Sequence, residues 1–538
     1  MEPGPSSFNS LRPAFEGADL ALSSYHATSG WIMNLVAFDN RWQWKQGRAT
    51  RAALGTTLFL TLAGCAVGPK FQVPDPPRVD RYGPAPTPAE VGSAQTPSGG
   101  IQRLQAGQAV PEQWWTAFGS EALNQRIATA LAHSPSVAAA RASLRQSQEL
   151  LQASRGAWFP AVDATAGASR TRLSVASGFP DTPFTLYNAS VNVSYTLDLF
   201  GGVRHGVELQ RAQVDSQRWQ LEGACLSLAA NVATASFQEA ALQQQLDATQ
   251  QVVALLQEQS ELSAKQYAIG VKSQGDLLAV QAQLASAQAG LAPMRLALAS
   301  LRNQLVVLLG RLPSEGGLQG GDLSGFKLPE EVPLSLPSEL VHRRPDVRAA
   351  EAQLLAATAQ VGLATANLFP NITLGGSYGS SALTTGDLFK EPTTTWSLGL
   401  NLLQPIFHGG SLRAQKRAAE AGLDGASAAY RTSVLNAFRE VSDTLNALQF
   451  DADAVQAQSQ AEDAASRSLD LVRAQYRIGS ASYLQLLDAT RQWQLARIGF
   501  IRARAARLAD TAALYAALGG GWRSQDGQAT RPAPRADR

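Results

Sequence analysis

The sequence contains the same series of landmarks twice, about 210 residues apart, and a fixed period of this kind marks a repeated structural unit. Pro135 and Phe159 of the first series correspond to Pro345 and Phe369 of the second. A Gly-Gly pair and a Tyr-x-x-Gly motif follow in both series. Four landmarks at nearly one spacing are difficult to obtain by chance, so the chain is predicted to be an internal duplication.

Each copy reads as one helix, two strands and a long helical hairpin. Proline starts the first helix, where its missing N–H costs nothing, and a Phe-Pro pair ends it. Apolar and polar residues then alternate, as in Tyr187 to Tyr195 and Trp396 to Leu402, which indicates strands with one apolar face. The stretches 203–266 and 411–475 lack proline and predict helices of roughly 96 Å, longer than a globular domain needs.

Four amphipathic strands in one chain cannot close a barrel, and a membrane does not tolerate open sheet edges. Three copies pool twelve strands, an even number within the range of known barrels. The fold class is therefore predicted as mainly α with a membrane β-barrel. A trimeric 12-stranded barrel, with four strands per subunit, continues into a 12-helix coiled-coil tunnel. A soluble coiled-coil protein with some β structure is the alternative.

The N-terminal region has the features of a lipoprotein leader. A basic flank at Arg48 precedes an apolar run that, at about eleven residues, is too short to span a bilayer. Leu62-Ala63-Gly64-Cys65 resembles a bacterial lipobox, so Cys65 is predicted to carry a covalent lipid, with no other cofactor. Ala66 in place of aspartate favours the outer membrane. Met33 is a plausible start, and an ordinary signal peptide with an incidental cysteine is the alternative.

The segments are assigned from the landmarks. They are a leader at 1–64, a lipid-anchored segment with equatorial packing at 65–118, repeat one at 119–311, an equatorial linker at 312–340, repeat two at 341–518, and a flexible tail at 519–538.

Composition argues against several classes of protein. A formal net charge of +2 is too small to indicate a nucleic-acid partner. The five histidines do not cluster, and the two cysteines cannot build a zinc site or a disulfide framework. Phosphate-loop, dinucleotide-binding and metalloprotease motifs are absent from the sequence. The chain is therefore expected not to be an enzyme.

Several motifs together resemble the TolC-like outer-membrane factor family, in its lipidated efflux-channel branch of OprM- and NodT-like lipoproteins. The resemblance covers almost the whole mature chain. The motifs that carry it are Cys65–Lys70, Trp114-Trp115 with Phe118, Arg343–Glu351, the two Phe-Pro pairs, Tyr-x-x-Gly at both turns, and Ala517–Trp522. Each motif is weak alone, but the combination is highly specific.

The resemblance implies a homotrimer in the bacterial outer membrane, in contact with its lipid and extended into the periplasm. It implies docking to a periplasmic adaptor, or membrane fusion protein, and to a proton-driven inner-membrane pump of the resistance–nodulation–division (RND) type. The implied function is a passive conduit that exports drugs or other small toxic compounds. Export of proteins or metal ions is an alternative, although Met294 is the single methionine of the mature chain, which disfavours copper. A periplasmic coiled-coil adaptor is a remote alternative.

The resemblance also implies a gate at the periplasmic end. Leu484 and Asp488 are four residues apart on one helix face, which in the family points into the pore. Three copies would form an apolar ring and a carboxylate ring. Gln485 occupies a position that is often acidic in the family, so the ring should carry less charge. Tyr476 and Asp276 correspond to a latch that closes the hairpins. An exposed carboxylate at 488 and simple packing of Tyr476 are the alternatives.

The resemblance places the adaptor-contact tips at the hairpin turns. The corresponding residues are Gly270 and Ser273 in the first turn, and Gly479 and Ser482 in the second. Glycine tolerates positive φ and so permits a tight reversal. The alternative role of the two serines is to cap the helices that follow.

Overall fold

The computed structural model describes residues 67–520, apart from residues 76, 78, 85, 87, 93–99, 173–181 and 317–319. These residues fall within one compact unit, Ala63–Arg538. The predictions for Cys65, the leader at 1–64 and the tail beyond residue 520 therefore lie outside the described residues.

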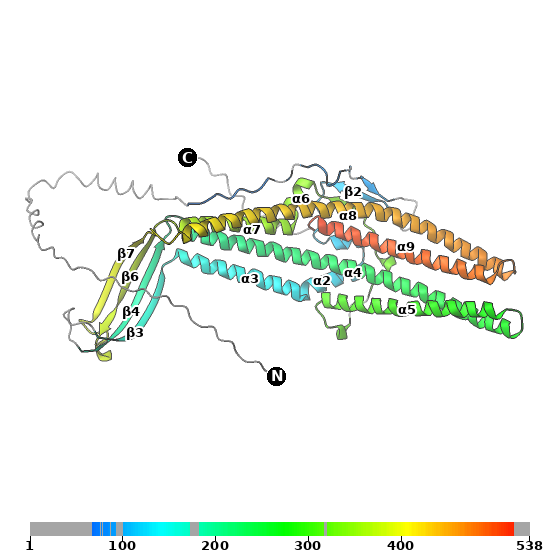
Figure 1. Ribbon diagram of the computed structural model, residues 1–538, viewed down its shortest axis with the longest axis horizontal. Coiled ribbons are helices and arrows are strands. Elements are labelled where there is room, and N and C mark those ends of the chain that lie inside the picture. Colours follow the sequence, from blue (N-terminus) through cyan, green and yellow to red (C-terminus); the bar gives the residue numbers. More distant parts are fainter. Residues whose placement is uncertain are drawn as a thin grey trace, which may run out of the picture. The chain divides into compact units, whose positions relative to one another are not determined.

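The first half of the chain has the order of elements that the sequence predicts, with an additional short helix at its start (Figure 1). Its elements are α2 (Glu121–His133), α3 (Pro135–Arg155), β3 (Ala161–Thr171), β4 (Phe184–Leu197), α4 (Gly202–Ala268) and α5 (Gln274–Leu308). Helix α4 has 67 residues and α5 has 35, and together they form the first helical hairpin.

The second half repeats this order. Its elements are α6 (Pro337–Arg343), α7 (Pro345–Ala366), β6 (Asn371–Ala382), β7 (Thr394–Leu403), α8 (Ser411–Arg477) and α9 (Tyr483–Ala517). Helices α8 and α9 have 67 and 35 residues, the same lengths as α4 and α5. The second helical hairpin therefore matches the first in length.

The four long strands form an antiparallel sheet in the order β3-β4-β6-β7. The register brings apolar residues together on one face, where Val191 pairs with Tyr378 and Tyr378 with Trp396. Hydroxyl groups line the other face, and those of Ser377 and Ser397 are 2.8 Å apart. Over the middle of the strands each face thus has one chemical character, as the alternation in the sequence predicts.

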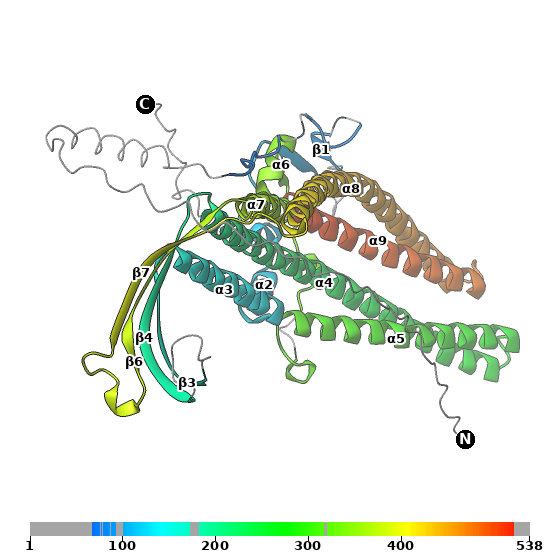
Figure 2. The same ribbon diagram turned by 60° about the vertical axis from the view of Figure 1, so that its left-hand side comes forward.

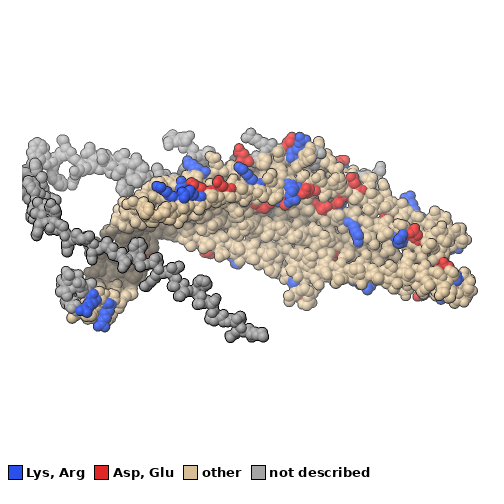
Figure 3. Space-filling view, viewed as in Figure 1, with Lys and Arg blue, Asp and Glu red and all other residues tan. Residues whose placement is uncertain are grey.

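The sheet carries little charge, and its outer strands have free edges. No Asp, Glu, Lys or Arg occurs in β4, β6 or β7. On the face that Figure 3 shows, charged side chains gather over the helices and at the tip of the sheet. Within the described residues, β3 and β7 each pair with one strand only, so the sheet is open on both sides.

A second, three-stranded sheet was not predicted from the sequence. Its strands are β1 (Glu90–Val91), β2 (Gln102–Ala106) and β5 (Glu331–Leu334), and β2 runs parallel to β5. This sheet therefore joins the N-terminal segment to the linker between the halves. From the sequence, these two segments were expected only to pack around the middle of the helical tube.

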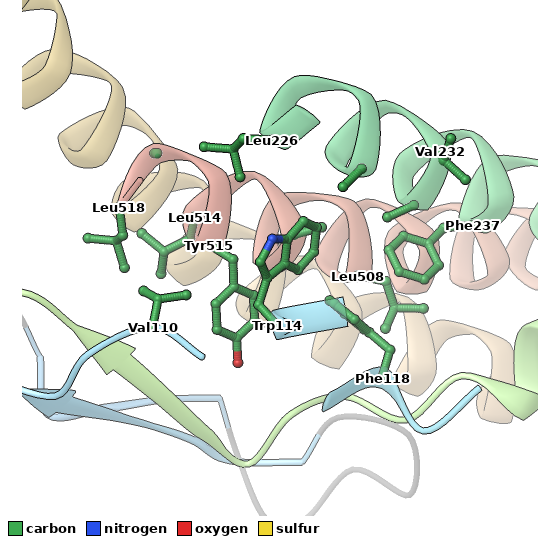
Figure 4. Close-up of a cluster of buried hydrophobic side chains, with 14 of the residues drawn as sticks. Val110, Trp114, Phe118, Leu226, Val232, Phe237, Leu508, Leu514, Tyr515 and Leu518 are labelled. Atoms are coloured by element: carbon green, nitrogen blue, oxygen red, sulfur yellow. The ribbon is translucent and has the colours of Figure 1, made fainter. Parts of the chain in front are cut away.

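The main core lies where this N-terminal segment meets α4 and α9 (Figure 4). Trp114 is buried and stacks on Tyr515 of α9, with ring centroids 5.6 Å apart. Phe118 packs against Phe237 of α4 at 4.9 Å. Aromatic rings bury large areas and favour such pairs, so this cluster fixes the middle of the helical bundle.

Arg344, in the Arg344-Pro345-Asp346 motif, connects three helices of the second half through hydrogen bonds. Arg344 donates hydrogen bonds to Asp346 at 2.7 Å, to Glu440 of α8 at 2.7 Å, and to the carbonyl of Ala517 at 2.8 Å. Its buried guanidinium therefore joins the start of α7 to α8 and to the end of α9. None of the helices in the described ranges is both long enough and apolar enough to cross a membrane.

Candidate functional site

The turns of the two helical hairpins lie at the end of the bundle opposite the four-stranded sheet (Figures 1 and 2). Gly270 has φ 75° and Gly479 has φ 80°, values in the left-handed region that favours glycine. The two turns share a hydrogen-bond pattern: Gly270 N–H donates to the carbonyl of Tyr267 at 2.9 Å, and Gly479 N–H to that of Tyr476 at 3.1 Å. The backbone conformation, and not lack of space, requires glycine, because a Cβ at either position would meet no neighbour.

A capping box begins each return helix. Ser273 Oγ accepts from Asp276 N–H at 3.2 Å, and the Asp276 carboxylate accepts from Ser273 N–H at 3.3 Å. Ser482 Oγ accepts from Gln485 N–H at 3.3 Å, and Gln485 Oε1 accepts from Ser482 N–H at 2.7 Å. The capping role considered for the two serines is therefore confirmed, and contact with an adaptor stays a prediction.

Tyr476 and Asp276, the expected latch, do not meet within the chain. The hydroxyl of Tyr476 accepts a hydrogen bond from Lys272 Nζ at 3.1 Å. The carboxylate of Asp276 is instead used by Ser273 of its own capping box, whose hydroxyl donates to it at 2.8 Å. The structure thus pairs Tyr476 with Lys272 in place of Asp276, because capping occupies Asp276 and the lysine stem is long enough to cross between the turns.

Apolar side chains from all four helices of the hairpins pack just above the turns. The buried members of this cluster are Val252, Leu256, Val280, Leu469, Tyr483, Leu486 and Leu487. Burial, and secondarily the proximity of Tyr476, raises the pKa of the Tyr483 phenol. The two hairpins therefore form one packed unit at this end.

Leu484 and Asp488 lie on one exposed face of α9, as the sequence predicts. The side chain of Leu484 is 71% exposed. Asp488 forms an ion pair with Arg491 at 3.1 Å, and both side chains are largely exposed. They line a shallow groove between α8 and α9 together with Gln485. An exposed pair of this kind contributes about 0–1 kcal/mol, so Arg491 affects the local charge more than the stability.

Arg491 and Lys272 are the residues that sequence reasoning missed at this end. The signal for Arg491 was its position three residues after Asp488, which places both on one helix face. Lys272 lies between a turn glycine and a cap serine, where nothing in the local pattern indicates a partner 204 residues away. In the part of the chain that the structure describes, no three His, Cys, Asp or Glu side chains gather to hold a metal ion.

Comparisons with known proteins agree with this arrangement. A family model described as "Outer membrane efflux protein" matches residues 127–311 and 336–520. The chain is 33% identical over 449 residues to the pyoverdine export outer membrane protein OpmQ of Pseudomonas putida, which covers 82% of this chain and 94% of that protein. It is 32% identical over 487 residues to the toluene efflux pump outer membrane protein TtgC of the same species, which covers 89% and 97%.

Solved structures have the same fold. The structure of the outer-membrane channel OprN superimposes with a TM-score of 0.75 at 28% sequence identity, and the match covers 85% of this chain and all of that one (100%). The family model also matches both halves of the chain over most of their length. The resemblance carried by the sequence motifs is therefore confirmed, and the chain belongs to the outer membrane efflux protein family.

Proposed function

We propose that this outer membrane efflux protein is a homotrimer that forms a passive duct from the periplasm to the outside. The observation that carries the proposal is the four-stranded sheet, with an apolar face, a hydroxyl-lined face and two open edges. In lipid, the unpaired backbone N–H and C=O groups of such edges can form hydrogen bonds only when strands of other copies close the sheet into a barrel. Three subunits supply twelve strands, with the apolar face toward lipid and the hydroxyl face toward the lumen.

The exposed surface of the helices supports assembly with further copies. Helix α4 is buried along much of its length, whereas α8, of equal length, is buried at fewer positions. Leu435, Phe450 and Leu471 of α8 are 60% to 70% exposed. In the proposed trimer, four helices per subunit give a ring of twelve, roughly 38 Å across between helix axes. Each subunit has two matching halves, which we attribute to duplication, and each half contributes two of its four helices to this ring.

The names of relatives support a proposal for the partners and cargo. Relatives are named for the export of pyoverdine and toluene, and we propose that this duct carries drugs or other small toxic compounds. An RND-type proton-driven pump in the inner membrane would supply the energy, through a periplasmic adaptor that contacts the turns at Gly270 and Gly479. The duct itself catalyses no reaction. A lipid on Cys65 would anchor the chain beside the barrel.

Efflux from intact cells tests the proposal. Native cells and a deletion strain are loaded with a fluorescent dye, then energised, and the loss of dye is followed with time. The deletion strain should retain the dye and become sensitive to toxic compounds, and the wild-type gene should restore both properties. Equal efflux with and without the gene would overturn the proposal.

Labelling with palmitate tests the anchor separately. Wild-type protein should incorporate label and Cys65→Ser should not, because the thiol is the acylated group. Replacement of the buried Cys225 by serine is the matched control and should leave labelling unchanged. Equal labelling of wild-type protein and Cys65→Ser would contradict lipidation at this residue.

A further inference from the structure

The ammonium group of Lys272, in the turn of the first hairpin, lies inside a box of aromatic and hydroxyl groups. Its Nζ is 4.1 Å from the ring centroid of Tyr483 and 5.6 Å from that of Tyr476. It donates hydrogen bonds to Tyr476 Oη at 3.1 Å and to Ser263 Oγ at 3.2 Å. A single side chain thus reaches α4, the end of α8 and the start of α9.

Ser263, Tyr476 and Tyr483 surround the ammonium group of Lys272. Ser263 is fully buried at 0% exposure, and Tyr483 is 6% exposed. The rings of Tyr476 and Tyr483 lie 5.7 Å apart at 60° to each other, so each presents part of its surface to the ammonium group. Cation–π attraction strengthens when the cation loses water, as it does here. Lys272 therefore supplies positive charge where the buried ring of Tyr483, the partly buried ring of Tyr476 and two hydroxyl oxygens face it.

We propose that Lys272 is a clasp that holds the two helical hairpins of one subunit together, and that its withdrawal from the tyrosine box accompanies opening of the periplasmic end. The inference rests on the proposed channel function and adds a positioning residue to it. Among the described residues, two other hydrogen bonds join the hairpins: Gln283 Nε2 donates to the carbonyl of Leu487 at 3.5 Å, which is much weaker, and Arg502 Nε donates to Gln245 Oε1 at 3.0 Å, far from the turns.

Single-channel recording of purified trimers in planar bilayers tests the clasp. Lys272→Met keeps the apolar stem and removes the charge, and it should raise the ratio of open to closed time by about 10-fold. Lys272→Arg keeps a cation that binds aromatic faces and should stay closer to wild type. Lys265→Met removes an exposed lysine from the last turn of α4 and is the matched control, with wild-type behaviour expected.

Rescue of a lysine-free variant by a small added cation provides a readout that loss of packing alone would not give. Lys272→Ala should also open more often, and ethylammonium added to the bath should return it toward wild type by occupying the vacated box. The same salt should leave wild-type channels unchanged. Absence of rescue, or wild-type gating in Lys272→Met, would overturn the clasp while leaving the channel function intact.

A distance measurement distinguishes failure of the Lys272 clasp from failure of the proposed channel function. Spin labels at the exposed positions 271 and 480, in a Cys225→Ser background, report the separation of the two turns in detergent-solubilised trimers. Lys272→Met should broaden and lengthen the distance distribution relative to Lys265→Met. If wild-type protein conducts no ions, the proposed function fails, and an unchanged distance distribution would still overturn the clasp.

Discussion

At the scale of single residues, Asp451 on α8 is a partly buried carboxyl group beside Asp510 on α9, and its Oδ2 has no hydrogen-bond partner among the described residues. Burial, followed by the neighbouring Asp510 carboxyl group, raises the pKa of Asp451 to about 7, against a smaller opposing effect of Arg507. Near neutral pH Asp451 therefore retains a proton, which relieves its repulsion with Asp510.

This proton predicts a pH-dependent stability. The folded pKa of Asp451 lies above its unfolded value of about 4, so the contribution is fully present below pH 4 and is lost as pH rises through about 7. Asp451→Asn cannot ionise, and its melting temperature should exceed that of wild type at pH 8 but not at pH 4. Asp453→Asn, at an exposed position of the same helix, should show no such change. An Asp451→Asn difference that is independent of pH would contradict the raised pKa of Asp451.

Glu239 on α4 is a second buried carboxylate, and it is held by two arginines. It accepts from Arg126 Nη2 of α2 at 2.7 Å and from Arg302 Nε of α5 at 2.9 Å, and its side chain is 5% exposed. Breaking a buried pair costs about 3–5 kcal/mol, because a charge remains without its partner. Glu239→Gln should therefore lower the denaturant midpoint strongly, and Glu258→Gln, at an exposed site on α4, should not. Equal denaturant midpoints for Glu239→Gln and wild-type protein would show that this ion pair does not stabilise the fold.

At the scale of elements, the two faces of the sheet predict opposite responses to the same substitution. Leu398 on β7 is 73% exposed on the apolar face, and its neighbour Ser397 points to the hydroxyl face. Leu398→Asp would place a carboxylate in lipid and should reduce the amount of trimer recovered from outer membranes. Ser397→Asp faces the proposed lumen and should assemble nearly as wild type. Equal recovery of the two variants would contradict the assigned faces.

The elements also show how far sequence reasoning reaches. Long proline-free stretches predicted α4 and α8, and strict alternation predicted β4 and β7, because both signals are local. The sheet of β1, β2 and β5 was missed, since β2 is five residues long and pairs with a strand more than 200 residues away. Lys272 was missed for the same reason, because its partner Tyr476 becomes a neighbour only when the two hairpins pack.

At the scale of the whole molecule, one subunit exposes apolar side chains at both ends, and the proposed membrane duct would cover them. The apolar residues of β7 are largely exposed, from Trp396 at 75% to Leu402 at 61%. The helical turns at the other end carry exposed Ile269 and Ile478, beside the clasp of Lys272. The chain thus has a surface suited to lipid at one end and a surface suited to a protein partner at the other.

The central claim is that three subunits close one barrel and one tunnel. Electron cryomicroscopy of the purified full-length protein in lipid nanodiscs tests it most directly. The account predicts a threefold particle in which three four-stranded sheets form one closed barrel of twelve strands, with Leu398 facing lipid and Ser397 facing the lumen. A monomer with an open sheet, or a closed barrel with Ser397 facing lipid, would contradict it.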